Sequence, residues 1–302
     1  MKGFIKSIIL FLIPIVVLAI SLETIIRHIP NSYELKSEYL ENNAERIETL
    51  ILGSSHSFYG INPKYFTAPA FNMSNVSQSP DVDLAILKSY EHQLTNLKTV
   101  VIRLSYDTLF EQLKLSPEDW RLKDYKLYTN VDLDYTLKHN SEVLAIGLKQ
   151  SLEVLKNEYF NNMPLLNCDS LGFGKVKSQL KKIDLDNAGR IAAKRHTISS
   201  WYLLHKNSEV FKKIIEHCNQ RHIKVLVVTP PAYKSYVNNL NTNQVDKMVE
   251  TGISLGEKYE NCSYHNFMTR LNLIHSDFYD ADHLNSTGAK KFSLILNSLI
   301  EN

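Results

Sequence analysis

The chain of 302 residues is poor in cysteine and carries little net charge, and each shortage excludes a class of protein. Its three cysteines, Cys168, Cys218 and Cys262, form no Cys-x-x-Cys pair, so no zinc knuckle, thioredoxin-like site or disulfide framework is predicted. A net charge of +2, without a basic cluster interleaved with aromatics, argues against binding to nucleic acid. The 44% of hydrophobic residues, with no internal repeat, instead indicates a globular protein with a core.

The N-terminus contains the only long run of apolar residues. Lys2 and Lys6 precede an uncharged stretch at residues 7–22, and a membrane span needs roughly 17–25 such residues. We therefore expect one transmembrane helix with its two lysines in the cytoplasm. The alternative is a cleaved signal peptide, with Ala19 and Ser21 near the cleavage site. Both interpretations place the rest of the chain on the extracytoplasmic, periplasmic side of the cell membrane.

Short β-branched runs alternate with amphipathic segments along the remainder of the chain. This rhythm predicts an α/β domain whose parallel sheet is covered by helices on both faces. We expect an anchor at residues 1–29, a helical connector at 30–46, and the domain at 47–302 with a helical insertion at about 110–201. Strands are predicted at residues 47–53, 98–105, 223–231 and 262–267, and helices at 80–94, 141–160, 207–220, 243–259 and 284–300.

Two polar motifs lie where the ligand-binding edge of such a sheet is expected. Gly53-Ser54-Ser55-His56 follows the first strand, and Asp280 and His283 precede the last helix. A serine at a tight turn suits a nucleophile, and a carboxylate three residues before a histidine can orient its ring. We predict Ser55, His283 and Asp280 as a catalytic triad; each motif alone is also typical of a turn or a helix cap.

Together these motifs resemble the first and last blocks of the SGNH/GDSL hydrolase superfamily. Gly53-Ser54-Ser55 is similar to its Gly-Asp-Ser block, with Ser54 in place of Asp, and Asp280-Ala281-Asp282-His283 is similar to its Asp-x-x-His block. The resemblance covers residues 47–60 and 223–302. It implies a three-layer α/β/α fold with a flavodoxin-like parallel sheet, serine esterase chemistry and no cofactor.

The string LILGSSHSFYGINP after a membrane segment looks like anchored SGNH-like proteins of bacterial envelopes. Those proteins take part in O-acetylation of polysaccharides or in D-alanylation, and commonly work beside a membrane-bound O-acyltransferase. The resemblance implies a polysaccharide or acylated sugar as substrate and such a membrane enzyme as a partner. The residues themselves do not distinguish a hydrolase from a transferase, and the anchor together with this resemblance favours a transferase.

The chain departs from the superfamily where an oxyanion-hole Asn is expected. Residues 103–107 after the second long strand contain no Asn. Asn72, Asn75 and the segment around Ser74 are the candidate replacements. Loss of one oxyanion donor typically costs about 100–1000-fold in turnover.

Further side chains are candidates for lining the site. His56 is adjacent to the nucleophile, and Tyr106 follows the second long strand, as Tyr59 follows the first. Arg195 and His196 are candidates for substrate binding from the insertion, with a solvated helix face as the alternative.

Two other functions are consistent with the same residues. His275, Asp277, Asp280, Asp282 and His283 form a dense ligand-type segment that would suit a metal-dependent hydrolase, with His56 as a distant partner. The missing Asn block would suit a non-catalytic scaffold that binds a polymer or a membrane O-acyltransferase.

Overall fold

The computed structural model describes residues 2–175 and 184–301, and its centre is a five-stranded parallel sheet. The strands lie in the order β2-β1-β3-β4-β5. Thr49 of β1 lies opposite Ala70 of β2 on one side and Thr99 of β3 on the other. This is the flavodoxin-like strand order, which confirms the predicted fold class. The strand bounds are β1 Thr49–Leu52, β2 Ala70–Asn72, β3 Thr99–Arg103, β4 Lys224–Thr229 and β5 Cys262–Asn266.

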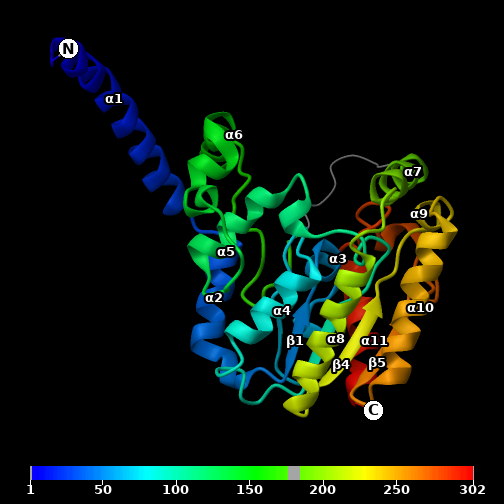
Figure 1. Cartoon of the computed structure of the whole chain (residues 1–302). Helices are drawn as coiled ribbons and strands as arrows, with labels where there is room; N and C mark the ends of the chain where they lie inside the picture. Colours follow the sequence, from blue (N-terminus) through cyan, green and yellow to red (C-terminus); the bar gives the residue numbers. More distant parts are fainter. Residues whose placement is uncertain (1, 176–183, 302) are drawn as a thin grey trace.

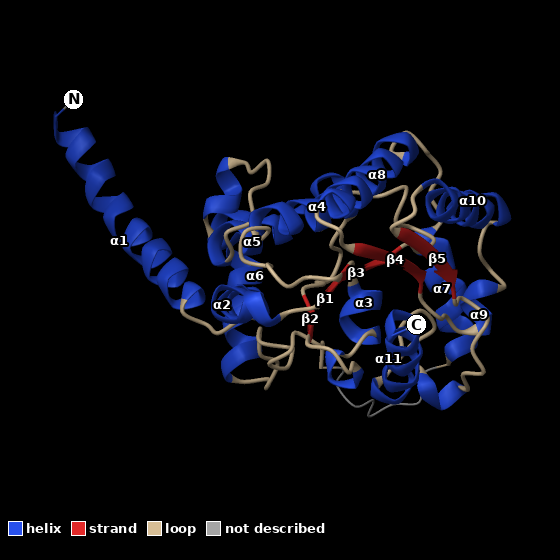
Figure 2. Ribbon diagram, turned by 90° about the horizontal axis from the view of Figure 1, so that it is seen from below, coloured by secondary structure: helices blue, strands red, loops and turns tan. Residues whose placement is uncertain are grey.

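Helices cover both faces of the sheet, as Figure 2 shows. On one face lie α4 (Pro80–Ser89), α8 (Leu204–Gln220) and α10 (Thr242–Lys258); on the other lie α3 (Ser55–Gly60), α7 (Leu185–His196), α9 (Lys234–Val237) and α11 (Ser286–Glu301). Val100 and Ile102 of β3 belong to the buried cluster of the first face, whereas Val101 packs in the second with Phe292. The middle residues of the central strands are apolar because both faces of the sheet are buried there.

The N-terminal helix α1 (Lys2–Arg27) projects away from the body (Figure 1). Within Gly3–Arg27 a stretch of 18 residues has a mean hydropathy of 2.7, and α1 is the one helix in the described residues that is long and apolar enough to cross a membrane. Towards its end, Leu22 and Ile26 are buried against the domain. A signal sequence has the same length and composition, so the structure is consistent with both interpretations of this segment.

The expected connector at residues 30–46 contains α2 (Ser32–Asn43), and this helix packs as part of the domain. Leu40 is buried in the main hydrophobic cluster. Lys36 is also fully buried, and its ammonium group donates to the Ser74 carbonyl and, at 3.3 Å, to Asn75 Oδ1. The connector therefore fastens the loop that follows β2.

Residues 104–223 connect β3 to β4 and include the predicted insertion at about 110–201. The described part of this insertion contains α5 (Leu122–Tyr128), α6 (Glu142–Tyr159) and α7, while residues 176–183 lie outside the described residues. Its described residues add no strand to the sheet. Helix α7 packs beside α9 at the edge of the sheet where the predicted site lies.

Two elements differ from the sequence-based expectation. The short helix α3, where the sequence indicated only a tight turn, and the three-residue strand β2 were not predicted. Strand β2 is too short for an alternating pattern, and it exists because its backbone pairs with β1.

Candidate functional site

Ser55 lies at the first position of α3, directly beyond the carboxyl end of β1. The turn requires Gly53, whose φ of +121° is unfavourable for other residues, and a Cβ there would lie 2.8 Å from Arg103 Cβ. The Gly53 N–H donates to the buried carboxylate of Asp83 at 3.0 Å, which fixes the turn. Strand, glycine turn and helix together present the Ser55 hydroxyl at the edge of the sheet.

Asp280 and His283 lie in a short loop before α11. Asp280 Oδ1 accepts hydrogen bonds from the backbone N–H groups of Asp282 at 3.1 Å and His283 at 2.8 Å. An Asp side chain that bonds to its own downstream backbone stabilises such a turn locally. The Asp-x-x-His spacing therefore shapes the loop and also directs the carboxylate toward the histidine ring.

The three predicted triad residues come together in space. Ser55 Oγ lies 2.8 Å from His283 Nε2, and His283 Nδ1 lies 3.0 and 3.1 Å from the two carboxylate oxygens of Asp280. A carboxylate at Nδ1 favours the tautomer with its proton there, which leaves Nε2 free to accept from the serine hydroxyl. The geometry is that of a serine nucleophile with its base and orienting acid.

Electrostatics favour the charged forms of the acid and the base, although both groups are buried. Burial alone would raise the pKa of Asp280, but the hydrogen bonds from His283 and from two backbone N–H groups lower it to about 2. Burial alone would lower the pKa of His283, but the hydrogen bond to Asp280 and the negative charge of Asp282 raise it above its usual value. An imidazolium formed during catalysis would thus be stabilised where it forms.

A second histidine lies against the base. The rings of His56 and His283 are stacked, with centroids 4.8 Å apart and planes inclined by 14°. Arg103 Nη1 donates to His56 Nδ1 at 2.9 Å and pairs with Asp107 at 3.0 Å. Burial, and then the positive charges of His283 and Arg103, hold the pKa of His56 well below its usual value, so the ring is neutral. The prediction that His56 lines the site agrees with this placement.

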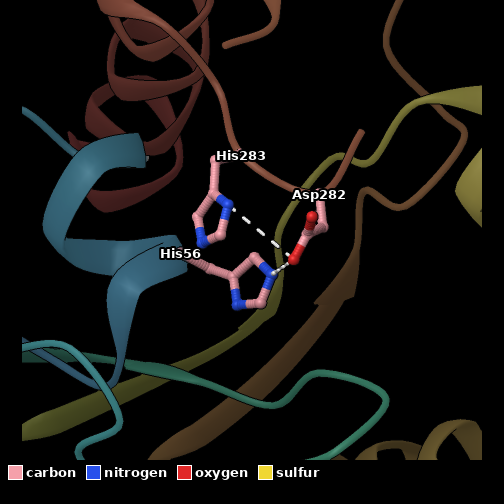
Figure 3. Close-up of side chains that lie close together, drawn as sticks. All are labelled: His56, Asp282 and His283. Carbon is pink, nitrogen blue, oxygen red and sulfur yellow. Dashed lines mark ion pairs between the residues drawn. The ribbon is translucent and has the colours of Figure 1, made fainter. Parts of the chain in front are cut away.

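Asp282 is the least satisfied group of the site. Its Oδ2 is buried and has no hydrogen-bond partner among the described residues, yet four nitrogens surround it. They are Arg195 Nη2 at 3.6 Å, His283 Nδ1 at 3.7 Å, His56 Nε2 at 3.8 Å and His196 Nδ1 at 4.0 Å. Burial, with the nearby Asp280 charge, raises the pKa of Asp282 to about 6. Figure 3 shows this carboxylate directed toward His56 and His283.

A cavity of about 680 Å³ opens beside Ser55, and most of the residues that line it are of polar or charged type. Arg195 and His196, predicted from the insertion, both line it, as does Tyr59. The lining also contains Asp282, which the sequence indicated only as a candidate metal ligand, and charged groups that the sequence did not identify as site residues: Arg103, Asp107, Glu111 and Glu118. Ion pairs that form only in the folded chain leave no periodic pattern in the sequence, so these charged residues could not be recognised from it. The one sequence feature that pointed to Asp282 was its position two residues after Asp280.

The candidate oxyanion donors are placed differently from the prediction. Asn72 Nδ2 donates to the carbonyls of Ser57 and Ile61 at 2.9 and 2.8 Å, so both of its hydrogens are used inside the fold. The Asn75 side chain is buried and contacts Gln78, and the Ser74 hydroxyl is buried without a partner in the described residues. None of the three side chains lines the cavity beside Ser55. The sequence shows that these three residues are polar, but it does not distinguish a role in buried hydrogen bonding from a role in catalysis.

Tyr106 also lies outside the site lining, contrary to the prediction. Its hydroxyl is 2.8 Å from Thr197 Oγ1 and accepts from the Asn241 backbone N–H at 2.9 Å, and its side chain is buried. Tyr106 thus joins the end of α7 to the start of α10, one layer behind the cavity.

The structure brings only some of the candidate metal ligands together. Ligand-type atoms of His56, Asp282 and His283 lie within 4.8 Å of one another, but Asp277 is paired with Lys291 at 2.8 Å. His275 packs edge-on against Tyr233. Both ring nitrogens of His283 already contact triad partners. A metal on this histidine would therefore displace Ser55 or Asp280.

Comparisons with known proteins give weak structural similarities. No protein-family model matches the chain, and no curated protein matches it. A solved structure of a proposed acylhydrolase from Bacteroides fragilis is 12% identical, with 87% of this chain and 94% of that chain covered and a TM-score of 0.40. A proposed lipolytic protein of the G-D-S-L family from Desulfitobacterium hafniense is 9% identical, with coverage of 83% and 99% and a TM-score of 0.39. A GDSL-like lipase from Bacteroides thetaiotaomicron is 9% identical, with coverage of 90% and 99% and a TM-score of 0.43. These low values say nothing about the reaction of this chain.

Proposed function

We propose that the protein is a membrane-anchored, extracytoplasmic serine esterase or O-acyltransferase of the SGNH/GDSL type that acts on ester groups of an envelope polysaccharide. The observation that carries the proposal is the line of hydrogen bonds from Ser55 through His283 to Asp280. The charged and hydroxylated lining of the adjacent cavity suits a sugar better than a long acyl chain. The apolar helix α1 supports membrane attachment.

The proposed reaction passes through an acyl-enzyme. Ser55 Oγ attacks the ester carbonyl while its proton moves to His283 Nε2, and Asp280 stabilises the resulting imidazolium. The tetrahedral adduct then collapses, the C–O bond to the leaving alcohol breaks, and His283 returns the proton to that alcohol. Water or a sugar hydroxyl next attacks the acyl group while its proton moves to His283 Nε2. The bond between the acyl carbon and Ser55 Oγ then breaks, and His283 returns the proton to Ser55 Oγ. We expect the Ser55 backbone N–H and the backbone of residues 76–77, which line the cavity, to hold the oxyanion.

Covalent labelling of Ser55 by a fluorophosphonate probe tests the chemistry. We expect labelling of the full-length protein in detergent, loss of labelling in Ser55→Ala, and strong slowing in His283→Ala. Ser57→Ala is the matched control, because Ser57 lies in the same helix but is buried. A folded protein that is not labelled would contradict the proposal and support the non-catalytic scaffold that binds a polymer or a membrane O-acyltransferase.

Hydrolysis and transfer differ only in the second acceptor. Release of p-nitrophenol from its acetate measures formation of the acyl-enzyme, and a mass increase of an oligosaccharide acceptor measures transfer. We favour transfer, with a membrane-bound O-acyltransferase as the partner that supplies acyl groups. Hydrolysis without acceptor modification across a broad oligosaccharide panel would contradict that preference.

A further inference from the structure

We propose that α6 is a membrane-surface helix, whose apolar stripe docks on the lipid bilayer beside α1. A kink at Gly147 (φ 78°, ψ 162°) divides the helix in two. In the second part, Leu148, Leu152, Leu155 and Tyr159 recur at the spacing of one helical face. Leu148 is 61%, Leu152 53% and Tyr159 63% exposed, so this face is uncovered in the single chain.

The composition of the stripe fits lipid better than water. Exposed lysines, Lys149 and Lys156, lie next to the leucines along the same part of the helix. An apolar stripe bordered by lysines is the pattern of helices that lie in the membrane interface and attract anionic lipid headgroups. Contiguous apolar patches on a protein surface mark contact sites with proteins or membranes.

The position of α6 identifies the bilayer as the occupant. Glu23 of α1 accepts hydrogen bonds from Ser141 Oγ at 2.7 Å and from the backbone N–H groups of Glu142 and Val143 at 3.0 Å each. Arg27 Nη2 donates to the Asn140 carbonyl at 2.6 Å. The last turns of the apolar helix are thus fixed to the start of α6, and Figure 1 shows α6 rising from the body on the side from which α1 leaves. A bilayer that contains α1 would lie against α6.

Docking of α6 would also place the site cavity near the membrane. The inner side of α6, at Ala145 and Ile146, lines a cavity of about 560 Å³ beneath the helix. That cavity shares Val76 and Pro117 with the cavity beside Ser55. The surface helix and the site therefore lie on the same end of the domain.

The test uses the full-length chain in vesicles of phosphatidylethanolamine and phosphatidylglycerol. The natural cysteines are buried, so Leu148→Cys and Leu152→Cys, each alone, can be labelled selectively with an environment-sensitive fluorophore. Ile253→Cys on α10 is the matched control, because Ile253 is an apolar side chain of similar exposure, 47%, away from α1. Glu153→Cys controls for the side of α6 that lines the inner cavity.

We expect nitroxide groups on the lipids to quench the labels at positions 148 and 152, and to leave those at 153 and 253 unquenched. Equal quenching at 152 and 253 would overturn the proposal. So would an unquenched label at 152 whose emission shifts with the ratio of protein to lipid, because a second copy would then cover the stripe. Extraction of each variant with carbonate confirms insertion through α1. The measurement needs no catalysis, so its outcome is separate from that of the serine labelling.

Discussion

The neutral ring of His56 lies flat against the ring of His283, 4.8 Å from centroid to centroid. Although the two rings are stacked, their surroundings favour different charge states. Burial, and then the charges of His283 and Arg103, lower the pKa of His56 and keep its ring uncharged. The hydrogen bond to Asp280 instead raises the pKa of His283 and favours its charged form. Of the two, only His283 contacts Ser55 Oγ. The stack therefore contains one base and one neutral supporting ring.

This asymmetry predicts different effects of replacing each histidine. His283→Ala should reduce kcat/KM for p-nitrophenyl acetate by roughly 10⁴-fold or more, because the serine loses its proton acceptor. His56→Phe keeps a flat ring against His283 and should cost orders of magnitude less. Steady-state kinetics and circular dichroism of both variants provide the measurement. Equal losses in two folded variants would assign His56 a direct part in the chemistry.

Replacing each of the two carboxylates next to His283 should likewise have different effects on activity. Asp280→Asn should lower kcat by roughly 10⁴-fold, since the amide no longer holds the required tautomer. Asp282→Asn should retain most of the activity at pH 8, because Asp282 Oδ2 lies 3.7 Å from the ring and outside hydrogen-bond distance. A large loss of activity in Asp282→Asn together with a small loss in Asp280→Asn would show that Asp282, and not Asp280, orients the His283 ring.

The pH profile gives a sharper readout of Asp282. His283 must be neutral to accept the serine proton, so kcat/KM should be full above the pKa of His283 and fall as the pH drops through it. The raised pKa of His283 places this limb above about 6.5. Asp282→Asn removes a negative charge that raises the pKa of His283, so the limb should move to lower pH. An unmoved limb would show that Asp282 does not influence the base.

Tyr106→Phe tests the placement of this residue behind the cavity. The variant loses the hydrogen bonds to Thr197 and Asn241, and we expect the free energy of unfolding to fall by about 1–3 kcal/mol. Because Tyr106 does not line the cavity, kcat/KM should change little. Tyr59→Phe is the companion variant, since Tyr59 does line it. A loss of activity in Tyr106→Phe without a loss of stability would show that Tyr106 acts in the site and not only in the fold.

Lys36→Met tests the buried lysine that fastens the loop after β2. Burial lowers the pKa of Lys36 to about 7, and the unfolded value is about 10.4. Between these values the unfolded chain holds a proton that the folded chain lacks, so the stability of the natural protein should rise with pH. The slope should be at most about 1.4 kcal/mol per pH unit, and Lys36→Met should lack this contribution.

Denaturant unfolding in detergent between pH 7 and pH 10 measures the difference between the two proteins. Lys98→Met is the control, because the Lys98 side chain is 70% exposed. Parallel stability curves for the natural protein and Lys36→Met would contradict a lowered pKa.

The sequence predicted those features that depend on local pattern. Strands β1, β3 and β4 are apolar runs ended by Gly, Ser or Pro, and the two triad motifs fall at the expected ends of the sheet. The flavodoxin-like order came from the resemblance to a superfamily, since alternation of strands and helices alone does not fix the order.

The features that the sequence did not reveal depend on distant contacts. Strand β2 has three residues and is defined by its pairing with β1. Arg103 pairs with Asp107 and donates to His56, and these contacts form only where the end of β3 lies beside α3. Asn72 and Tyr106 were assigned to the site because they are polar and near it in sequence, and the fold uses both for internal hydrogen bonds.

Ser55 and His283, the proposed nucleophile and its proposed base, are separated by 228 positions in the chain. A ribosome therefore makes the serine long before the histidine and the helix α11 that follows it. Until that helix packs, the hydroxyl has no proton acceptor and is as inert as any alcohol in water. A chain interrupted between the two residues would carry the serine without its proposed base, so we expect the proposed reactivity only after both segments have been made and packed together.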